Sequence, residues 1–142
     1  MLVNKALDEG IPERISVLVG IEVMRRLKAR ATRRYSYRLV VAPEHLGTVF
    51  YLAGLSPDTT KTFRYAAFLE MLGNKHRLAL QESFTGQSEI DLAAHHHLKF
   101  HAPDYYGDTF RKIVGNDETV WEGPGFEIPC ISLSRAFYPE YH

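Results

Sequence analysis

The sequence of 142 residues holds one cysteine, Cys130, so it can form neither an internal disulfide nor a multi-cysteine zinc site. Its longest apolar runs, residues 15–21 and 49–55, are far too short to cross a bilayer. Acidic residues precede the first of these runs and arginines follow it, which is the reverse of the order in a secretory signal. These absences predict a cytoplasmic protein with no membrane partner, and the cytoplasm is that of a host cell if the chain comes from a mobile element or a phage.

Two common catalytic motifs are missing as well. The sequence has no G-x-S-x-G motif, and the glycines within residues 123–125 do not stand between a strand and a helix, as a phosphate-binding loop requires. Cys130 follows a proline within an apolar segment, where a thiol is more often buried and inert. A serine or cysteine nucleophile is therefore not expected.

The composition is that of an ordinary globular chain, with 45% hydrophobic and 24% charged residues, and its length predicts one domain over residues 1–142. The formal net charge of zero hides an uneven distribution. Residues 25–38 carry seven Arg or Lys and no acid, whereas the chain from residue 39 onward has eight basic and thirteen acidic residues.

The basic block has two interpretations. It could bind the phosphates of a nucleic acid. It could equally be the solvated C-terminal end of a helix, where the helix dipole favours positive charge. The candidate nucleic-acid contacts are Arg25, Arg26, Lys28, Arg30, Arg33 and Arg34.

Two helices are expected in the first half of the chain. Pro12 suits the first turn of a helix, and apolar residues recur after it at helical spacing, which predicts a helix over residues 12–33. Ser56 as N-cap and Pro57 at the next position predict a second helix over residues 56–73. The buried face of this second helix would consist of Tyr65, Phe68, Leu69 and Leu72.

Segments rich in β-branched and aromatic residues predict strands over residues 35–42, 47–55, 76–84, 118–123 and 126–133. A third helix is expected over residues 102–115, because its apolar residues share one side and a glycine ends it. Residues 89–101 are ambiguous. Ser88 and Asp91 resemble a helix cap, but apolar and polar residues alternate strictly, so we expect a strand.

From residue 47 onward the expected order is β-α-β-β-α-β. That order is the ferredoxin-like split βαβ arrangement of the α+β class, with helices covering one face of an antiparallel sheet. The core would span about residues 47–122. The helix over residues 12–33 and the first strand would be N-terminal additions to it.

A histidine-rich strand over residues 89–101 would have a definite chemistry. His95 and His97 would project from one face about 6.5–7 Å apart, close enough to hold one divalent ion. Glu82 from the neighbouring strand is the preferred third ligand, with Glu89 or His101 as alternatives. Two nitrogens and a carboxylate oxygen predict Mn, Mg or Zn as cofactor. Histidines on an open sheet face are also often simple polar surface.

A His-x-His pair on a central strand of a ferredoxin-like sheet, with a tyrosine on the following helix, resembles the HUH endonucleases. This family includes rolling-circle replication initiators, relaxases and single-strand transposases, and the likeness covers about residues 47–115 in outline. The resemblance implies that a metal ion polarises a phosphate of single-stranded DNA and that a tyrosine attacks it. The implied metal ligands are His95, His97 and Glu82, and the implied nucleophile is Tyr105 or Tyr106.

Two other functions stay open. A non-catalytic module could bind nucleic acid or protein through the exposed tyrosines and arginines, for example as a phage-type regulator or inhibitor. Alternatively, a trimeric ferredoxin-like protein could bind a small molecule between subunits. In that homo-oligomer the aromatic tail, residues 136–142, would pack on a neighbour.

Overall fold

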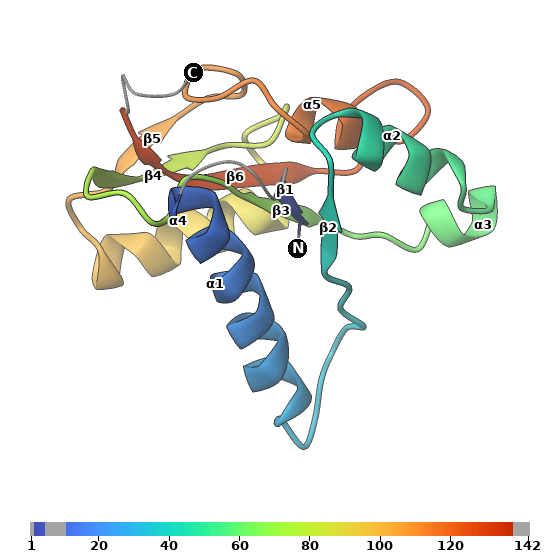
Figure 1. Cartoon of the computed structure of the whole chain (residues 1–142), viewed down its shortest axis with the longest axis horizontal. Coiled ribbons are helices and arrows are strands. Elements are labelled where there is room, and N and C mark those ends of the chain that lie inside the picture. The colour runs from blue at the N-terminus through green and yellow to red at the C-terminus, as the bar shows by residue number, and fades with distance from the viewer. Residues whose placement is uncertain (1, 5–10, 138–142) are drawn as a thin grey trace.

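A six-stranded mixed sheet runs through the molecule in the computed structural model, which describes residues 2–4 and 11–137 (Figure 1). The strand order is β2-β1-β3-β6-β4-β5. Four of the five described pairings are parallel, and the pairing of β4 with β6 is antiparallel. The strands are β1 (Leu2–Asn4), β2 (Val40–Ala42), β3 (Ala66–Leu69), β4 (Arg77–Gln81), β5 (Tyr106–Asp108) and β6 (Cys130–Ala136).

Helices lie on both faces of this sheet. They are α1 (Ile11–Lys28), α2 (Leu46–Ala53), α3 (Pro57–Thr60), α4 (Glu89–His101) and α5 (Glu118–Trp121). Residues of β6 point alternately to the two faces. On one face Cys130 packs with Leu52 of α2 and Trp121 of α5. On the other face Ile131 packs with Leu98 of α4. Figure 1 shows α4 and α5 on opposite sides of the sheet, with α1 extending away from it.

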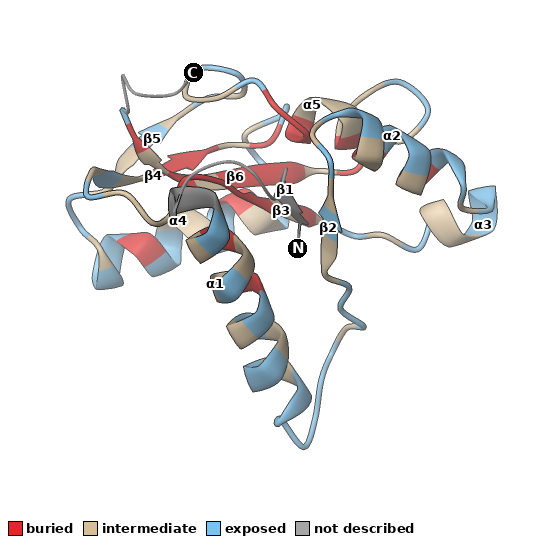
Figure 2. Ribbon diagram, in the orientation of Figure 1, coloured by how far each residue is buried: buried red, intermediate tan, exposed pale blue. Residues whose placement is uncertain are grey.

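The core follows the central strands. Phe68 of β3 and Leu80 of β4 are fully buried, each in the cluster on its own face. Figure 2 shows buried residues concentrated in the sheet, while α1 is mainly a mixture of exposed and intermediate residues and the segment after it is mostly exposed. None of the described helices combines the length and the apolar character that a bilayer span requires.

Several predictions are confirmed. The chain has a mixed α+β fold with an open sheet. The helix predicted over residues 12–33 is α1, although it ends at Lys28. The strand predicted over residues 76–84 contains β4. The predicted strands over residues 35–42 and 126–133 overlap β2 and β6.

The ferredoxin-like connectivity is wrong, because the sheet is mostly parallel and carries helices on both faces. The strand predicted over residues 47–55 is wrong, because most of that segment lies in the helix α2 (Leu46–Ala53). The helix predicted over residues 56–73 shrinks to the single turn α3, which Ser56 does cap by accepting a hydrogen bond from the Thr59 N–H. The remainder enters the sheet as β3, because pairing with β1 and β6 outweighs the helix propensity of its Ala and Leu residues.

The second half holds the other corrections. Residues 89–101 form α4, whose start is fixed by a capping box between Ser88 and Asp91. The helix predicted over residues 102–115 is absent there, and β5 pairs with the end of β4 instead. Residues 118–123 begin as α5 and not as a strand. Most of the aromatic tail lies outside the described residues, so its predicted packing stays a prediction.

Candidate active site at the start of α2

Three ionisable side chains meet where β2 gives way to α2. His45 Nε2 lies 3.6 Å from Glu44 Oε1, and His45 Nδ1 lies 3.9 Å from Asp117 Oδ1. The backbone N–H of His45 donates to the same Asp117 oxygen at 2.6 Å. The side chains of His45 and Glu44 are 48% and 36% exposed, whereas Asp117 is fully buried. The buried carboxylate of Asp117 thus holds His45, and His45 in turn lies beside the partly exposed Glu44.

The backbone at this point is strained. His45 has φ 51° and ψ −65°, a conformation that residues with a Cβ rarely adopt. The turn is also tight, because a Cβ at Gly47 would lie 2.6 Å from the Ala42 Cβ. Such strain persists only where surrounding contacts enforce it, and strained residues cluster at functional sites. The hydrogen bond from the His45 N–H to Asp117 is one such contact.

Behind these groups lies a network of buried polar side chains. Asn116 Nδ2 donates to Glu70 Oε1 at 2.7 Å, at the end of β3. Glu118 Oε1 accepts from the Asn116 N–H at 2.9 Å and from Gln81 Nε2 at 3.2 Å. Gln81 Oε1 in turn accepts from the backbone of Ile113 and Val114. The network therefore joins the carboxyl ends of β3 and β4 to the start of α5.

Burial shifts the protonation of these acids. Desolvation raises the pKa of Asp117 above its ordinary value, although the hydrogen bond from the His45 N–H opposes it. Desolvation also raises the pKa of Glu118, against the opposing hydrogen bond from the Asn116 backbone. Groups whose pKa is moved by burial beside a charged partner are candidates for acid–base chemistry.

Several buried polar atoms on this face of the sheet lack a hydrogen-bond partner within the part of the chain whose side chains are described, residues 14–137. They are Thr48 Oγ1, Asp117 Oδ2, Glu118 Oε2, Trp121 Nε1, Ser132 Oγ and Ser134 Oγ. Folded proteins leave few such atoms, and each needs an explanation. Because Thr48, Asp117 and Glu118 are among them, this face of the sheet is a candidate for the functional one.

The described residues do not by themselves form a metal site. Among them, no three His, Cys, Asp or Glu side chains are arranged to hold one ion. His45 turns different ring nitrogens toward Glu44 and Asp117, so these three groups do not share a point as they are placed. The divalent metal expected from the sequence stays a prediction.

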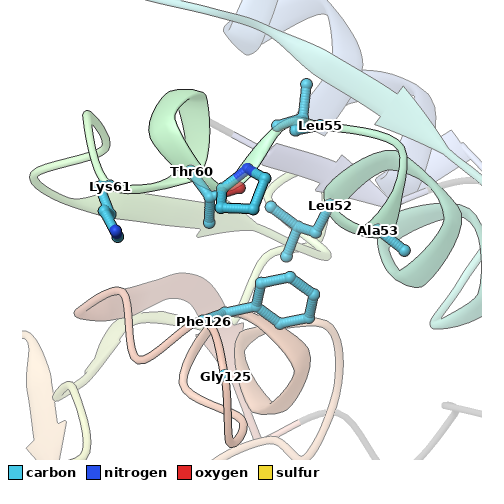
Figure 3. Close-up of a pocket in the computed structure, with 8 residues that line it drawn as sticks. Leu52, Ala53, Leu55, Thr60, Lys61, Gly125 and Phe126 are labelled. Carbon is cyan, nitrogen blue, oxygen red and sulfur yellow. The ribbon is translucent and has the colours of Figure 1, made fainter.

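A small pocket lies at the far end of α2, between that helix, α3 and the turn that contains Gly125 (Figure 3). Its volume is about 230 Å³, and Leu52, Leu55 and Phe126 make it largely apolar, with Lys61 at its edge. The length of α2 separates it from His45, a distance of about 10 Å at 1.5 Å per residue. The pocket is therefore not part of the Glu44, His45 and Asp117 group.

The structure brings together three of the five residues assigned from the sequence to metal binding or nucleophilic attack. His95 Nε2 lies 2.8 Å from Glu82 Oε1, and His95 Nδ1 lies 2.7 Å from Tyr105 Oη. The other two point elsewhere. On a helix, side chains two residues apart lie on nearly opposite sides, and His97 stacks on His101 with ring centroids 4.2 Å apart. Tyr106 donates to Asp108 Oδ2 at 2.6 Å.

The predicted nucleic-acid contacts are all exposed, in the last turn of α1 and in the segment that follows it. Arg25 and Arg26 form ion pairs with Glu22, each at 2.7 Å. Arg34 lies over the ring of Tyr35 at 5.2 Å. A phosphate-binding role for Arg25, Arg26, Lys28, Arg30, Arg33 and Arg34 stays a prediction.

Sequence reasoning missed Glu44, His45 and Asp117. The sequence carries one weak signal for them, the run Asn-Asp-Glu at residues 116–118, because acidic residues are enriched in the first turn of a helix. Glu44 and His45 stand in a connection between two expected strands, where polar residues carry no special meaning. Only the fold brings the two segments together.

Residues 13–142 match the family described as Domain of unknown function (DUF4910), and the chain belongs to that family. A relative from Clostridium acetobutylicum, named "Putative polysaccharide biosynthesis protein with aminopeptidase-like domain", is 25% identical over 126 residues, which cover 89% of this chain and 29% of the relative. A crystal structure from the same organism, described as a "putative peptidase", matches with a TM-score of 0.85 and 22% identity, over 98% of this chain and 32% of that one. The chain thus spans less than a third of the length of either protein.

These relatives overturn the HUH endonuclease resemblance and the nucleic-acid-directed function drawn from it. The predicted nuclease activity, DNA binding and mobile-element or phage character are wrong on the same grounds. The physical reason lies in α4. The HUH pattern needs two histidines side by side on a strand, and here they lie on a helix with their rings turned apart.

Proposed function

We propose that this DUF4910 chain forms part of a peptidase-like hydrolytic domain whose reacting groups are Glu44 and His45, held by Asp117. The names of the two relatives supply the reaction class, hydrolysis of a peptide bond. The observation that carries the proposal is the strained His45, fixed between an exposed and a buried carboxylate. This group combines solvent access, backbone strain and an acid with a raised pKa.

The chemistry follows from the positions of these groups. The pair of Glu44 and His45 takes a proton from a water molecule, and the water oxygen attacks the peptide carbonyl carbon. The same pair then returns the proton to the amine nitrogen as the carbon–nitrogen bond breaks. Asp117 positions His45 by accepting the hydrogen bond that the His45 backbone N–H donates. Such general acid–base catalysis contributes about 10²–10⁴-fold to a rate.

The experiment is a hydrolysis assay on the purified chain with a panel of aminoacyl-p-nitroanilides and short peptides. We expect Glu44→Gln and His45→Ala each to lower kcat/KM by about 100-fold or more without unfolding the protein. His96→Ala is the matched control, because His96 is an exposed histidine on α4, on the opposite face of the sheet. Wild-type protein that hydrolyses no member of the panel, or His45→Ala protein with full activity, would contradict the proposal.

The hydrolysis assay should also test whether the reaction depends on a divalent ion. The sequence predicts Mn, Mg or Zn at His95, His97 and Glu82. The carboxylate and imidazole donors of Glu44, His45 and Asp117 are also types that such ions accept. Because no three described side chains converge, any further ligand would come from outside the described residues. Elemental analysis of protein purified without a chelating resin, and the assay repeated with each added ion, decide whether a metal takes part.

A further inference from the structure

A second chemical group lies on the opposite face of the sheet. It consists of Glu82, His95 and Tyr105, which come from the end of β4, the middle of α4 and the segment before β5. The imidazole of His95 bridges the other two, with Nε2 at 2.8 Å from Glu82 Oε1 and Nδ1 at 2.7 Å from Tyr105 Oη. Both distances are normal for hydrogen bonds.

The position of Glu82 separates this group from the Glu44, His45 and Asp117 site. Successive strand residues point to opposite faces, and Gln81 points toward Glu118 on the α5 side. Glu82 therefore points toward α4, where Tyr105 packs against the cluster that contains Leu98. The two groups share no side chain, so each can be tested without the other.

The hydrogen bonds fix the direction of proton transfer. A carboxylate only accepts hydrogen bonds, so the His95 Nε2–H donates to Glu82. In a neutral imidazole the other nitrogen, Nδ1, then accepts, and the Tyr105 hydroxyl donates to it. In the Ser-His-Asp triad of hydrolases, a hydroxyl donates to an imidazole, which donates to a carboxylate. Tyr105, His95 and Glu82 have the same order, with a phenol in place of the serine hydroxyl.

The group is open to small molecules. The side chains of His95 and Glu82 are 31% and 21% exposed, and Tyr105 is half-buried. Gly107 of the edge strand β5 lies beside the two rings. A Cβ at Gly107 would come within 3.2 Å of Tyr105 Cε2 and 3.3 Å of His95 Cε1. A glycine at this position leaves the rings room that a larger residue would fill.

We propose that Glu82, His95 and Tyr105 form a nucleophilic triad in which the Tyr105 oxygen accepts an acyl group from an activated ester or thioester. The phenol oxygen attacks the acyl carbon as its proton passes to His95 Nδ1. The bond from the acyl carbon to the alcohol or thiol then breaks, and the leaving group takes up the proton that His95 Nδ1 received, so that an aryl ester of Tyr105, a neutral His95 and a free alcohol or thiol result. Tyr105 and His95 are the catalytic residues, and Glu82 is a positioning residue that holds the imidazole tautomer.

Charge favours an acyl donor over a phosphoryl donor. Among the described residues, the charged side chain that forms a hydrogen bond within this group is Glu82, whose carboxylate bonds to His95. An acyl ester is neutral, whereas a phosphoryl donor carries negative charge that this carboxylate repels.

The test uses p-nitrophenyl acetate, with release of p-nitrophenolate followed by absorbance and the acetylated residue identified by peptide mass spectrometry. We expect a burst of about one equivalent, with acetyl on Tyr105. Tyr37, whose exposed fraction is 42%, serves as the internal comparison. Tyr105→Phe removes only the hydroxyl and is expected to abolish the burst. Acetylation of Tyr105 no faster than that of Tyr37 would overturn the proposal.

Variants of His95 and Glu82 test whether these residues take part in the acetylation of Tyr105 or only support the structure around it. His95→Gln is expected to slow acetylation of Tyr105 at least about tenfold, since a glutamine amide cannot accept the phenol proton as a base. Glu82→Gln should slow it, and Glu82→Asp, which keeps the carboxylate, should restore most of the rate. If His95→Gln acetylates Tyr105 at an unchanged rate, or if both Glu82 variants lose the same rate, these residues only support the structure and the proposed triad is wrong. His45→Ala is expected to leave the burst unchanged, which keeps this result distinct from the hydrolysis assay.

Discussion

Asp91 and Asp117 are both fully buried aspartates, yet the fold uses them in opposite ways. Asp91 accepts four hydrogen bonds, from the backbone N–H and the hydroxyl of both Ser83 and Ser88, at 2.6–2.9 Å. Asp117 accepts one from the His45 backbone, and its Oδ2 has no partner among the described residues. The two carboxylates therefore have the same solvent exposure but differ in the number of hydrogen bonds that they accept.

The pKa values follow the same division. Burial by itself raises the pKa of Asp91, but the hydrogen bonds from Ser83 and Ser88 outweigh it and hold that pKa below its usual value. At Asp117 burial prevails over the opposing effects of the His45 backbone N–H and the nearby Thr48 hydroxyl, and the pKa is raised. Ionisation of Asp91 therefore stabilises the fold, whereas ionisation of Asp117 costs stability.

The largest expected effect comes from removing the satisfied carboxylate. Asp91→Ala leaves one buried and one part-buried backbone N–H and two hydroxyls without their acceptor, and we expect a loss of about 3–5 kcal/mol in the free energy of unfolding. For a chain of this length that corresponds to a fall of roughly 10 °C or more in Tm. Urea unfolding measures it, with the exposed Asp104→Ala as control. A loss below about 1 kcal/mol would remove the distinction drawn between the two aspartates.

Asp117→Asn should have the reverse profile. We expect kcat/KM for peptide hydrolysis to fall about 100-fold, which corresponds to roughly 2.7 kcal/mol in the activation free energy. Stability should stay within about 1 kcal/mol of the wild type, because the amide removes a buried charge and its oxygen can still accept from the His45 N–H. Parallel assays and urea unfolding measure both quantities. Unfolding without a specific loss of rate would assign Asp117 a structural role like that of Asp91.

A smaller effect is expected at Glu118. Its pKa is raised by burial, so its contribution to stability is complete below the pKa of an unfolded glutamate and is lost as pH rises through the folded value. In Glu118→Gln the amide oxygen can accept the same hydrogen bonds from Asn116 and Gln81 without a charge. We expect this variant to be about 1 kcal/mol more stable than the wild type at pH 8, with the gain shrinking at pH 5. A variant that is less stable at both values of pH would contradict this account.

The smallest effect is local and concerns acid pH. The lowered pKa of Asp91 means that its stabilisation is complete above the unfolded pKa of about 3.9 and is lost as pH falls through the folded value. Protection of the Ser83 and Ser88 amides against hydrogen exchange should therefore weaken below about pH 4. The Asn116 amide, bound to Glu118, should keep its protection there. Equal loss at the three amides would indicate global unfolding instead.

Some elements could be predicted because their signals are local. The periodic apolar stripe and Pro12 identify α1, and Ser56 with Pro57 identifies the start of α3. The length of α3 could not be predicted, because the residues after it are good helix formers. They become β3 through pairing with β1 and β6, which are distant in sequence.

The error at residues 89–101 has a different cause. Ile90, Ala94 and Leu98 lie on the side of α4 that faces the hydrophobic core, at a spacing of four residues. Since four is a multiple of two, the same residues also satisfy a strand pattern. The deciding signal was the capping box of Ser88 and Asp91, whose reciprocal hydrogen bonds favour the helix. Glu82, His95 and Tyr105 do lie together, but His95 reaches the other two from the helix α4 and not from the predicted strand.

By itself the sequence determined the globular composition, the single thiol, the main N-terminal helix and the mixed α+β class. These follow from composition and from periodicity within short windows. Only the tertiary structure decided the strand order, the burial of Asp117 and the approach of that residue to His45, 72 positions away in the chain. The reason is physical. Desolvation and hydrogen bonding between distant segments depend on how the sheet is paired, and no local pattern of residues specifies that pairing.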